Sequence, residues 1–396
     1  MISYVRRFIY RHFADMRVLK RLAGPRIVEA LKRMVNAGRL VVSKPFDEVF
    51  PDAAPNTVYG EKEIPYGEIK TLNVRSENRI DEQEGVYRRP PLFTSIVDDA
   101  LICPSNNVVI NRDREVVQES INMRGRTELG LNRQKLCRSR IDAIDGSATL
   151  LRGPAIGYWH AQLDSLPRLS LLRHEPYRSL PTIKLLRPEG GPAVNVELED
   201  FLVPKIAPPN CEIVEVPPDR LYSVENYIFA SFLTFPFSAY LPEFYLDLLR
   251  ERACPDRERR RAERIFISRK KASRRNVLNE NELSGRLGER GFETYHLEDL
   301  HISEKVDLFY DAEIVVSPTS SGLSSLLYTK NIPVVELFPM PTITHPANYF
   351  LSLSVDNKHH YIPHDGDSLT SDFRANVDET IDKVDALLSA RSRALS

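Results

Sequence analysis

The chain has 396 residues, which is enough for two domains with separate hydrophobic cores. Its 54 Lys and Arg residues nearly balance 55 Asp and Glu residues, so the formal net charge is −1. This balance argues against nucleic acid as a partner, because proteins that bind a phosphate backbone carry a basic excess. The cysteines stand singly and lack zinc-ligand spacing, which predicts reduced thiols in a cytoplasmic protein: Cys103, Cys137, Cys211 and Cys254.

Residues 1–33 predict a basic amphipathic helix. They contain nine Lys or Arg residues, and Val5, Phe8, Ile9 and Phe13 recur at helical spacing. One interpretation is peripheral docking on the anionic inner face of a membrane, where each basic residue contributes about 1 kcal/mol. The alternative is a terminal helix packed on its own domain. Arginines interrupt the apolar residues early, so neither a signal peptide nor a transmembrane helix is expected.

The next segments predict an α/β domain. Residues 41–95 are rich in Pro and charge and are interpreted as a linker. From residue 93, "SIVDDALICPSNNVVINRDREVV" alternates apolar runs with Asn and Asp, which is typical of a β-hairpin. A helix is expected over residues 158–172, followed by the short strands "TIKLL", "FLVP" and "CEIVEV".

Beyond residue 264 strands and helices alternate regularly. "RIFISR" predicts a strand, and Asn279 with Glu282 predicts a helix start resembling a capping box, closed by Gly291. "FETYHL", "EIVVS" and "PVVELF" predict further strands, separated by a helix that Ser303 opens and by the helix "GLSSLLYT". Short connections between them predict a parallel sheet of Rossmann type.

Ligands of such sheets bind outside the carboxyl ends of the strands. A basic loop and a serine-rich loop follow two of these strands. Ten basic and two acidic residues lie between Arg257 and Arg275. We interpret Arg269, Arg274 and Arg275 as a phosphate clamp, because guanidinium groups match phosphate oxygens bidentately. The earlier part, "DRERRRAER", is interpreted as an exposed, solvated helix end.

A second set of polar residues lies in "GYWHAQLDSLPRLSLL". His160 and Asp164 are four residues apart, so on a helix both project from one face. An imidazole beside a carboxylate can act as a general base. The alternative is a surface pair on a helix whose leucines are core. Pro167 fits the first turn of a continuing helix or a kink.

Four stretches occur in the order and at roughly the spacing of glycosyltransferase family 61. They are "GYWHAQLDSLPRL", "IFISRKKASRRNVLNENEL", "GFETYHLEDLHISEKVDLFYDAEIVVSPTSSGL" and "VVELFP", and the resemblance covers about residues 93–340. Bacterial members are usually described as capsular or extracellular polysaccharide biosynthesis proteins. Besides the His160 helix, the most specific positions are Ser268, Arg269, Arg275, Asn279, Glu280 and Glu282.

The resemblance implies a GT-B fold, in which two Rossmann-like domains face across a cleft. On this basis we expect an N-terminal helix and linker (1–65), an acceptor-binding domain (66–245), a nucleotide-sugar domain (246–360) and a closing helix (361–396). That helix, expected over 371–390, would pack across both domains or peripherally on the second. The family implies an inverting, metal-independent reaction without a cofactor, between a nucleotide-sugar and a glycan or lipid-linked glycan acceptor.

The resemblance also implies residue roles. His160, or Asp164 through it, would deprotonate the acceptor hydroxyl. Arg269 and Arg275 would hold the donor phosphates, and Glu336 would bind the ribose hydroxyls. Asn279 and Glu282 would contact the donor or only cap their helix.

The serine-rich loop departs from the family pattern. Family members commonly have a His-Gly-Ala-Gly-Leu turn where this chain has Thr319, Ser320, Ser321, Gly322 and Leu323. Hydroxyls at a helix N-terminus can hold a phosphate, so the loop is a predicted donor contact. A UDP- or GDP-sugar is the favoured donor, and a CMP-activated acidic sugar is the alternative. A serine here can instead be only an N-cap. A further alternative is a catalytically degenerate scaffold subunit of a polysaccharide assembly complex.

Overall fold

The computed structural model describes residues 43–67, 80–81, 85–121, 140–234 and 238–395. The predicted basic helix of residues 1–33 lies outside this part of the chain. The chain forms an α/β protein with two compact units. Unit 1 contains Pro91–Val196, Ala207–Phe232 and the described residues of Met1–Gly60. Unit 2 contains Glu61–Pro90, Glu197–Ile206 and Leu233–Ser396. Each unit is therefore made of several segments, whereas each predicted domain was one continuous range.

Unit 1 is built on a mixed sheet with the order β1-β8-β7-β6-β12-β9-β10-β11, in which β2 also pairs with β6. The strands are β1 (Ser43–Lys44), β2 (Asn56–Tyr59), β6 (Leu92–Cys103), β7 (Val108–Ile110), β8 (Val116–Val117), β9 (Ile141–Leu150), β10 (Ile183–Pro188), β11 (Cys211–Val216) and β12 (Leu221–Ala230). Strands β12, β9, β10 and β11 are parallel neighbours, whereas β2, β6 and β7 pair antiparallel. The predicted hairpin is β6–β7. The sheet therefore contains a parallel half, but it is not the fully parallel sheet of a Rossmann domain.

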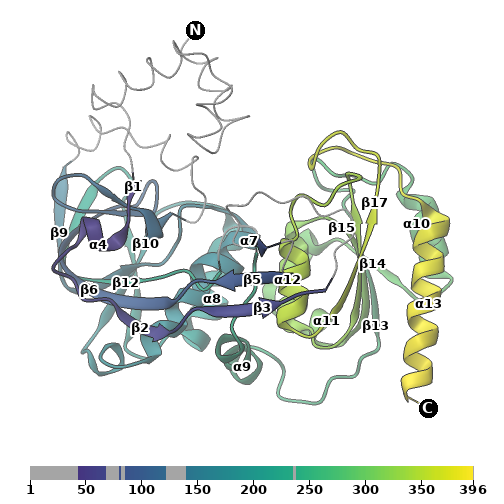
Figure 1. The fold of residues 1–396 in the computed structure, drawn as a ribbon, viewed down its shortest axis with the longest axis horizontal. Coiled ribbons are helices and arrows are strands. Elements are labelled where there is room, and N and C mark those ends of the chain that lie inside the picture. The colour runs from purple at the N-terminus through teal and green to yellow at the C-terminus, as the bar shows by residue number, and fades with distance from the viewer. Residues whose placement is uncertain (1–42, 68–79, 82–84, 122–139, 235–237, 396) are drawn as a thin grey trace, which may run out of the picture. The chain divides into compact units, whose positions relative to one another are not determined.

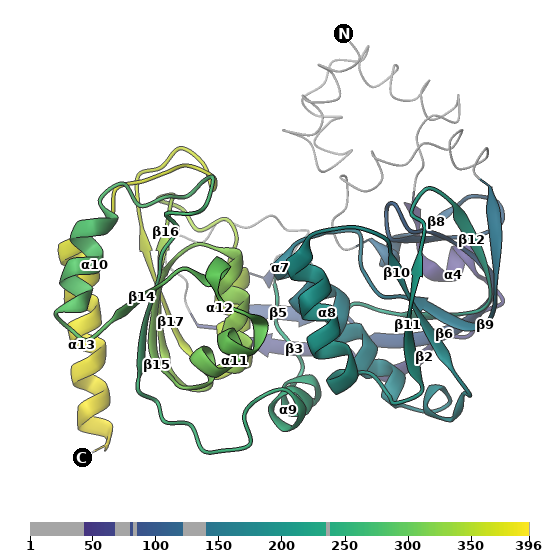
Figure 2. The ribbon, with the colours of Figure 1, turned by 180° about the vertical axis from the view of Figure 1, so that it is seen from behind.

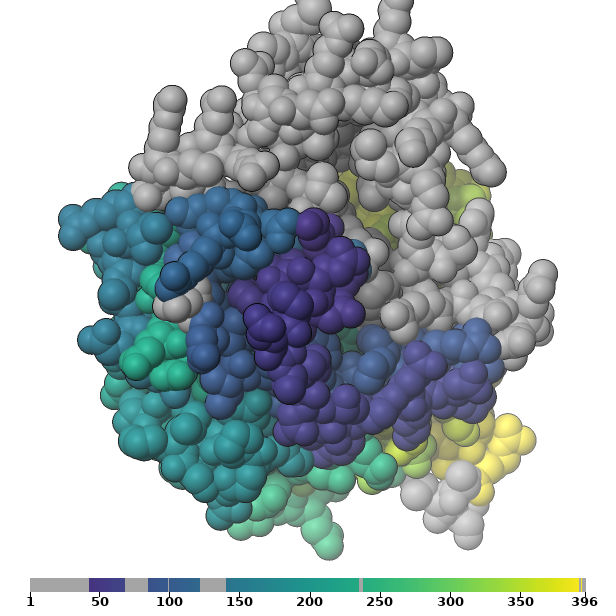
Figure 3. Space-filling view, turned by 60° about the vertical axis from the view of Figure 1, so that its left-hand side comes forward, coloured from purple at the N-terminus to yellow at the C-terminus, as the bar shows by residue number. Residues whose placement is uncertain are grey.

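The start of the predicted linker belongs to the core of unit 1. The short helix α4 (Phe46–Val49) buries Phe46, whose ring lies 5.4 Å from Phe93 and 4.9 Å from Phe229 between centroids. Figure 3 shows the purple segment that begins at Ser43 on the surface of unit 1, beside the blue residues of β6 to β8. Composition alone hid this role, because few apolar residues in the segment carry the packing.

The predicted helix after β9 is present, with three successive geometries. It comprises α7 (Tyr158–His160), the π turn η3 (Ala161–Ser165) and the 3-10 helix η4 (Leu166–Arg173). Pro167 is the second residue of the 3-10 part, where its missing N–H costs nothing. The shorter 3-10 turns of unit 1 are η2 (Gln118–Ser120) and η5 (Tyr177–Ser179).

The predicted strand "FLVP" is wrong. These residues lie in helix α8 (Ala193–Ile206), whose Leu198, Leu202 and Ile206 are fully buried at helical spacing. Pro204 falls near the end of the helix, where fewer intrahelical bonds follow it. Four residues were too short a window to separate a buried strand from a buried helix.

Unit 2 contains the predicted parallel sheet, with the order β14-β13-β15-β16-β17. The strands are β13 (Glu263–Ile267), β14 (Glu293–Tyr295), β15 (Ala312–Pro318), β16 (Pro333–Phe338) and β17 (Lys358–Pro363), and every neighbouring pair is parallel. In chain order this is 2-1-3-4-5, one of the two common doubly wound arrangements. Strand β17 was not predicted, because its polar sequence "KHHYIP" carries no apolar run.

Helices cover both faces of this sheet. Figures 1 and 2 show α10 and α13 on one face and α11 and α12 on the other. Besides the greater part of α8, the described helices of unit 2 are α9 (Glu243–Arg252), α10 (Glu280–Gly288), η6 (Leu297–Asp299), α11 (Ile302–Tyr310), the 3-10 helix η7 (Ser321–Tyr328), α12 (Ala347–Ser354) and α13 (Val377–Leu395). Among the described residues, none of the helices is sufficiently long and apolar to cross a membrane.

Several predicted helix boundaries differ from the structure. Helix α10 ends at Gly288, and Gly291 turns the chain at a φ of 75° two residues beyond the C-cap. Helix α11 is capped by His301, whose backbone N–H donates to the Glu304 carboxylate at 2.7 Å, so Ser303 does not open it.

The C-terminal helix packs on the parallel sheet of unit 2, which is the second of the two predicted arrangements. Val377, Ile381 and Val384 of α13 belong to the apolar core on the parallel sheet. Arg290 donates to the two oxygens of Asp385 at 2.6 and 2.8 Å, which joins α13 to the end of α10.

The rest of the predicted linker folds with unit 2. Strands β3 (Lys62–Pro65), β4 (Ile80–Asp81) and β5 (Val86–Arg89) form a sheet in the order β3-β5-β4. Ile64 and Tyr87 pack on Phe350 of α12 in one buried cluster. Strands β3, β4 and β5 therefore group with unit 2, and the domain boundary expected near residue 65 stays a prediction.

Candidate active site

The basic loop and the serine-rich loop follow the carboxyl ends of two neighbouring strands of the unit 2 sheet. Strand β13 ends at Ile267 and β15 ends at Pro318, and the two strands pair in parallel. The strand order reverses here, because β14 lies outside β13 while β16 lies beyond β15. In open α/β sheets this switch point is where ligands bind. The predicted donor residues of both loops therefore share one location.

Three arginines of the basic loop carry charges that no carboxylate neutralises directly. The Nε and Nη2 atoms of Arg269 donate to the carbonyl oxygen of Arg274 at 3.1 and 2.9 Å. Among the described residues, neither these two side chains nor Arg275 forms an ion pair. Burial lowers the pKa of Arg269, although Glu298 and Asp372 partly oppose that effect through space. Three cations so close together favour an anionic ligand.

Arg275 is the least satisfied of the three. Its φ of 60° places the backbone in the left-handed region, which a bulky residue seldom adopts. Its Nε is buried and has no hydrogen-bond partner among the described residues. Burial, followed by the charges of Arg269 and Arg274, lowers its pKa to about 10, while Glu336 acts in the opposite direction. An unpaired buried donor is costly, so the side chain is arranged to receive an acceptor.

Glu280 holds the start of the basic loop in place. Its carboxylate accepts a hydrogen bond from Ser268 Oγ at 2.6 Å and another from the backbone N–H of Arg269 at 3.3 Å. The side chain is 3 % exposed. The resemblance singled out Glu280 as part of a specific motif. No local pattern indicated that its side chain would bind the residues that follow β13.

Asn279 occupies the N-cap position of α10, but its side chain does not cap the helix. Its Oδ1 accepts from the backbone N–H of Ala375 at 2.8 Å, and its Nδ2 donates to the Ala375 carbonyl at 3.0 Å. Glu282 accepts from Asn279 Nδ2 at 3.3 Å and is exposed. The predicted capping box is thus replaced by a clamp on the segment that precedes α13, and a donor contact by either residue stays a prediction.

The serine-rich loop is tied to the next strand by its first residue. Thr319 donates from Oγ1 to Glu336 Oε1 at 2.6 Å, and its N–H donates to the Leu337 carbonyl at 3.1 Å. Ser320 is the N-cap residue of η7 but makes no side-chain capping bond, and Ser321 is exposed. A Cβ on Gly322 would lie 2.6 Å from Leu297 Cδ1, which explains the glycine.

Glu336 is fully buried beneath this loop. Besides Thr319, its carboxylate accepts from Asn348 Nδ2 at 2.9 Å and contacts His359 Nε2 at 3.0 Å. Both oxygens are therefore bonded within the protein. The ribose contact predicted for Glu336 stays a prediction. No local pattern in the sequence indicated that Asn348 and His359 would bind this carboxylate.

In unit 1, His160 and Asp164 meet as their spacing predicts. The distance from His160 Nδ1 to Asp164 Oδ2 is 2.6 Å, and the two side chains are 28 % and 12 % exposed. The intervening residues form the π turn η3, a local irregularity that occurs frequently at functional sites. The helix follows the end of β9, where β12 ends beside it in parallel. With Nδ1 occupied by Asp164, Nε2 is the nitrogen that can reach a ligand.

Arg168 is a buried cation behind this pair. Its Nε donates to the Ser165 carbonyl at 3.1 Å and its Nη2 donates to the Leu150 carbonyl at 3.1 Å. The guanidinium lies 4.8 Å from the centroid of the Phe232 ring. Burial lowers the pKa of Arg168, and Tyr227 and Asp164 oppose that effect. One side chain thus joins the ends of β9 and β12 to the π turn.

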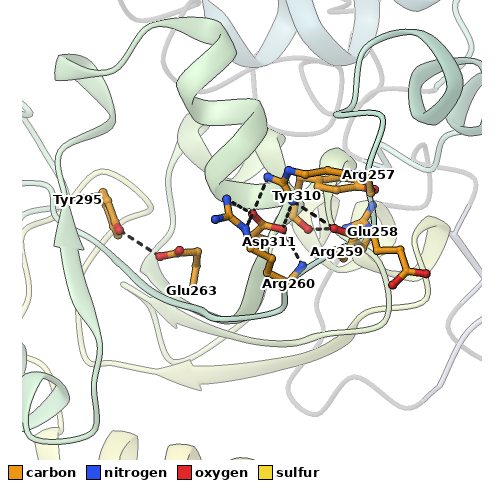
Figure 4. A network of polar contacts seen from close by, with 8 residues as sticks. All are labelled: Arg257, Glu258, Arg259, Arg260, Glu263, Tyr295, Tyr310 and Asp311. Atoms are coloured by element: carbon orange, nitrogen blue, oxygen red, sulfur yellow. Dashed lines mark hydrogen bonds and ion pairs between the residues drawn. The ribbon is translucent and has the colours of Figure 1, made fainter.

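The first half of the basic stretch is not the solvated helix end predicted. Residues 255–262 are not helical, and Figure 4 shows Arg257, Arg259 and Arg260 converging on Tyr310 and Asp311. Arg257 donates to the two oxygens of Asp311 at 2.8 and 2.7 Å. Burial acts to raise the pKa of Asp311, but hydrogen bonds from Arg257 and Arg260 outweigh it and hold that pKa at about 2. These arginines therefore anchor the entry to β13.

The structure thus gathers the predicted donor residues at one sheet edge of unit 2 and joins His160 to Asp164 in unit 1. Residues 158–335 match the family model described as Glycosyltransferase 61. No curated protein matches the chain. The matched stretch includes the His160 helix, the basic loop and the serine-rich loop, and it ends just before Glu336. The predicted resemblance is confirmed over these residues: they match glycosyltransferase family 61, and this family implies a glycosyltransferase.

Proposed function

We propose that the protein is an inverting glycosyltransferase that transfers a sugar from a nucleoside-diphosphate donor to a glycan hydroxyl. The observation that carries the proposal is the group of three arginines at the switch point between β13 and β15, none of which forms an ion pair with a residue that the structure describes. Backbone N–H groups of the adjoining loops add to the positive potential there. The proposal adopts the GT-B arrangement, with the donor in one domain and the acceptor in the other.

The charge at this location favours a diphosphate. Arg269, Arg274 and Arg275 are three cations, and the buried Nε of Arg275 has no acceptor among the described residues. A nucleoside diphosphate offers two linked phosphate groups, whereas a CMP-activated acidic sugar offers one. We therefore keep a UDP- or GDP-sugar as the donor. As the sugar leaves, the second phosphate gains charge, and preorganised guanidinium groups stabilise that charge.

The acceptor side of the reaction is assigned to the pair in unit 1. His160 Nε2 takes the proton from the acceptor hydroxyl, while Asp164 holds Nδ1 and stabilises the imidazolium that forms. The acceptor oxygen forms a bond to the anomeric carbon as the bond from that carbon to the phosphate oxygen breaks. The products are the extended glycan and a nucleoside diphosphate, and the imidazolium later releases its proton to solvent. Inversion follows from attack opposite the leaving group.

Catalytic variants test the base. His160→Ala and Asp164→Asn are each expected to lower kcat by roughly 10²- to 10⁴-fold with little change in the KM for the donor. His174→Ala is a matched control, because His174 follows the same helix outside the π turn. Turnover close to that of the wild type in both variants would remove the assignment.

Metal independence is part of the proposal. The chain does contain an Asp-x-Asp sequence, in which exposed Asp365 and Asp367 follow β17. If the arginines take the place of a divalent ion, dialysis against EDTA is expected to leave the activity unchanged. Activity that disappears on dialysis and returns with Mg²⁺ or Mn²⁺ would contradict this part.

The acceptor and the location complete the proposal. We infer a glycan or lipid-linked glycan acceptor in polysaccharide biosynthesis, with the enzyme in the cytoplasm and residues 1–33 touching the inner face of the membrane. Cosedimentation with vesicles containing about 30 % anionic lipid tests the contact. Binding that falls steeply with salt and is lost on deletion of residues 1–33 is expected.

A further inference from the structure

Beneath the serine-rich loop lies a buried polar network that spans four elements. Thr319 follows β15, Glu336 lies in β16, Asn348 and Ser352 belong to α12, and His359 lies in β17. The side chains of Glu336 and His359 are 0 % and 1 % exposed. A buried carboxylate survives only when its oxygens are bonded, and this one has three protein partners.

The network resembles a Ser-His-acid catalytic arrangement but cannot act as one. Ser352 Oγ lies 2.8 Å from His359 Nδ1, and His359 Nε2 lies 3.0 Å from Glu336 Oε2. Ser352 is fully buried, as is Glu336, so no substrate atom can approach the hydroxyl. With the Glu336 carboxylate ionised, Nε2 carries the proton and donates, while Nδ1 accepts from Ser352.

The same burial bears on the ribose contact predicted for Glu336. Its Oε1 already accepts from Thr319 at 2.6 Å and from Asn348 at 2.9 Å, and its Oε2 is taken by His359. A ribose hydroxyl would have to displace one of these partners and reach an atom without exposed surface. The bond from Thr319 instead connects the carboxylate to the first residue of the serine-rich loop.

We propose that Glu336 and His359 form a buried positioning pair that fixes the serine-rich loop through Thr319, and that Glu336 does not contact the ribose of the donor. This inference rests on the proposed donor site. The pair sets where Ser320, Ser321 and Gly322 present their backbone to a phosphate. The Glu336 carboxylate also acts on Arg275 through space.

A ligand cycle separates positioning from ribose contact. The Kd values of UDP and GDP are measured against those of their 2′,3′-dideoxy analogues, for the wild type and Glu336→Gln. If the role is positioning, Glu336→Gln raises the Kd of each nucleotide and the Kd of its dideoxy analogue by the same factor, within about twofold. Thr319→Val is expected to weaken both likewise, because it removes the same bond. Glu289→Gln, at the exposed end of α10, is the control for loss of a negative charge.

A ribose contact predicts the opposite pattern. The wild type would then bind the dideoxy analogue with a Kd roughly tenfold or more above that of the parent nucleotide. In Glu336→Gln the two Kd values would differ little. Such coupling between the Glu336 side chain and the ribose hydroxyls would overturn the inference.

A stability cycle tests the pair without any ligand. If Thr319, Glu336 and His359 act as one unit, Thr319→Val and Glu336→Gln each lower Tm, and the double variant melts within ~1 °C of the worse single variant. The same holds for Glu336→Gln with His359→Gln. Additive losses would overturn the positioning role. Absence of UDP and GDP binding by the wild type would contradict the donor site instead, and the stability cycle would still decide this inference.

Discussion

Arg168 shows how one buried residue can serve a site that it does not touch. Its hydrogen bonds go to the carbonyls of Leu150 and Ser165, so its charge is shared with backbone dipoles rather than cancelled by a bonded carboxylate. Asp164 acts on it through space. Removing the guanidinium would take one hydrogen bond from each of these carbonyls and would loosen the end of the π turn.

Arg168→Lys and Arg168→Met separate charge from geometry. Lysine keeps the charge but cannot span both carbonyls, and methionine fills the space without charge. We expect both variants to lose about 2 kcal/mol of folding stability in denaturant unfolding. We expect kcat to fall at least tenfold in Arg168→Met, because the π turn that carries His160 and Asp164 loses the side chain that holds its end. An unchanged kcat would assign Arg168 to folding alone.

The sequence indicated the chemistry of single residues better than their partners. Arg269, Arg275 and the pair His160 and Asp164 were identifiable, because charge runs and i,i+4 spacing are local features. The network of Glu336 was not, because its partners come from separate elements far along the chain. Pairing across elements depends on strand order, which no local pattern contains.

At the scale of elements, the basic loop is joined to the segment before α13. Leu278 N donates to the Phe373 carbonyl at 2.8 Å, and Phe373 N donates to the Asn276 carbonyl at 3.1 Å. Asn279 adds its two bonds to Ala375, and Asn276 N donates to Asp372 Oδ1 at 2.8 Å. The C-terminal segment therefore supports the loop that carries Arg275, although it lies outside the matched residues 158–335.

Asn279→Ala tests this support. It leaves the backbone N–H and carbonyl of Ala375 without their side-chain partners, so we expect a loss of about 1–3 kcal/mol in denaturant unfolding. The Kd for a nucleoside diphosphate should rise with it, as the loop loosens. Ser284→Ala, in the same helix with a single bond to the Asn281 carbonyl, is the control. A stable variant with an unchanged Kd would show that the clamp does not support the loop.

The regular part of the fold could be predicted because each element carries its own period. Strands β13, β15 and β16 each carry consecutive buried apolar residues, as parallel strands covered on both faces require. Elements with a mixed or short signal were missed or misjudged: β17, the strand "FLVP" and the pieces within the supposed linker. Their positions depend on tertiary packing, such as that of Tyr87 on Phe350.

At the scale of the whole molecule, the half-buried His360 and the buried His364 make stability sensitive to acid. Burial lowers the pKa of His360 to about 4 and also lowers that of His364. His364 accepts from the Asn376 N–H at 3.2 Å, which requires a neutral ring nitrogen. The unfolded chain takes up these protons near pH 6.5, whereas the folded protein resists until lower pH. Their contribution is thus fully present above about pH 6.5 and is lost as the pH falls toward about 4.

The wild type should therefore have a lower free energy of unfolding at pH 5 than at pH 7. In His360→Gln this dependence should become shallower, because one group that takes up a proton on unfolding is gone. Urea unfolding at several pH values measures both slopes. Equal slopes in the two proteins would contradict the assignment.

The domain boundaries were the least predictable feature at this scale. The chain leaves unit 1 for unit 2 and returns, so Glu61–Pro90 and Glu197–Ile206 fold with residues far along the sequence. Amino-acid composition is a local property, so it does not indicate that a segment folds with residues far along the chain. The parallel sheet of unit 2 needed no such excursion for its five strands, and it was the part predicted best.

The switch point between β13 and β15 is the proposed binding site for the phosphates of a nucleotide donor. The most direct test is titration of the wild type and Arg275→Ala with UDP, GDP, TDP and CMP, using Arg252→Ala at the exposed end of α9 as the matched control. We predict that one nucleoside diphosphate binds the wild type and the control equally and binds Arg275→Ala roughly 10- to 100-fold more weakly. Binding of none of the four nucleotides, or equal binding by Arg275→Ala, would contradict the account.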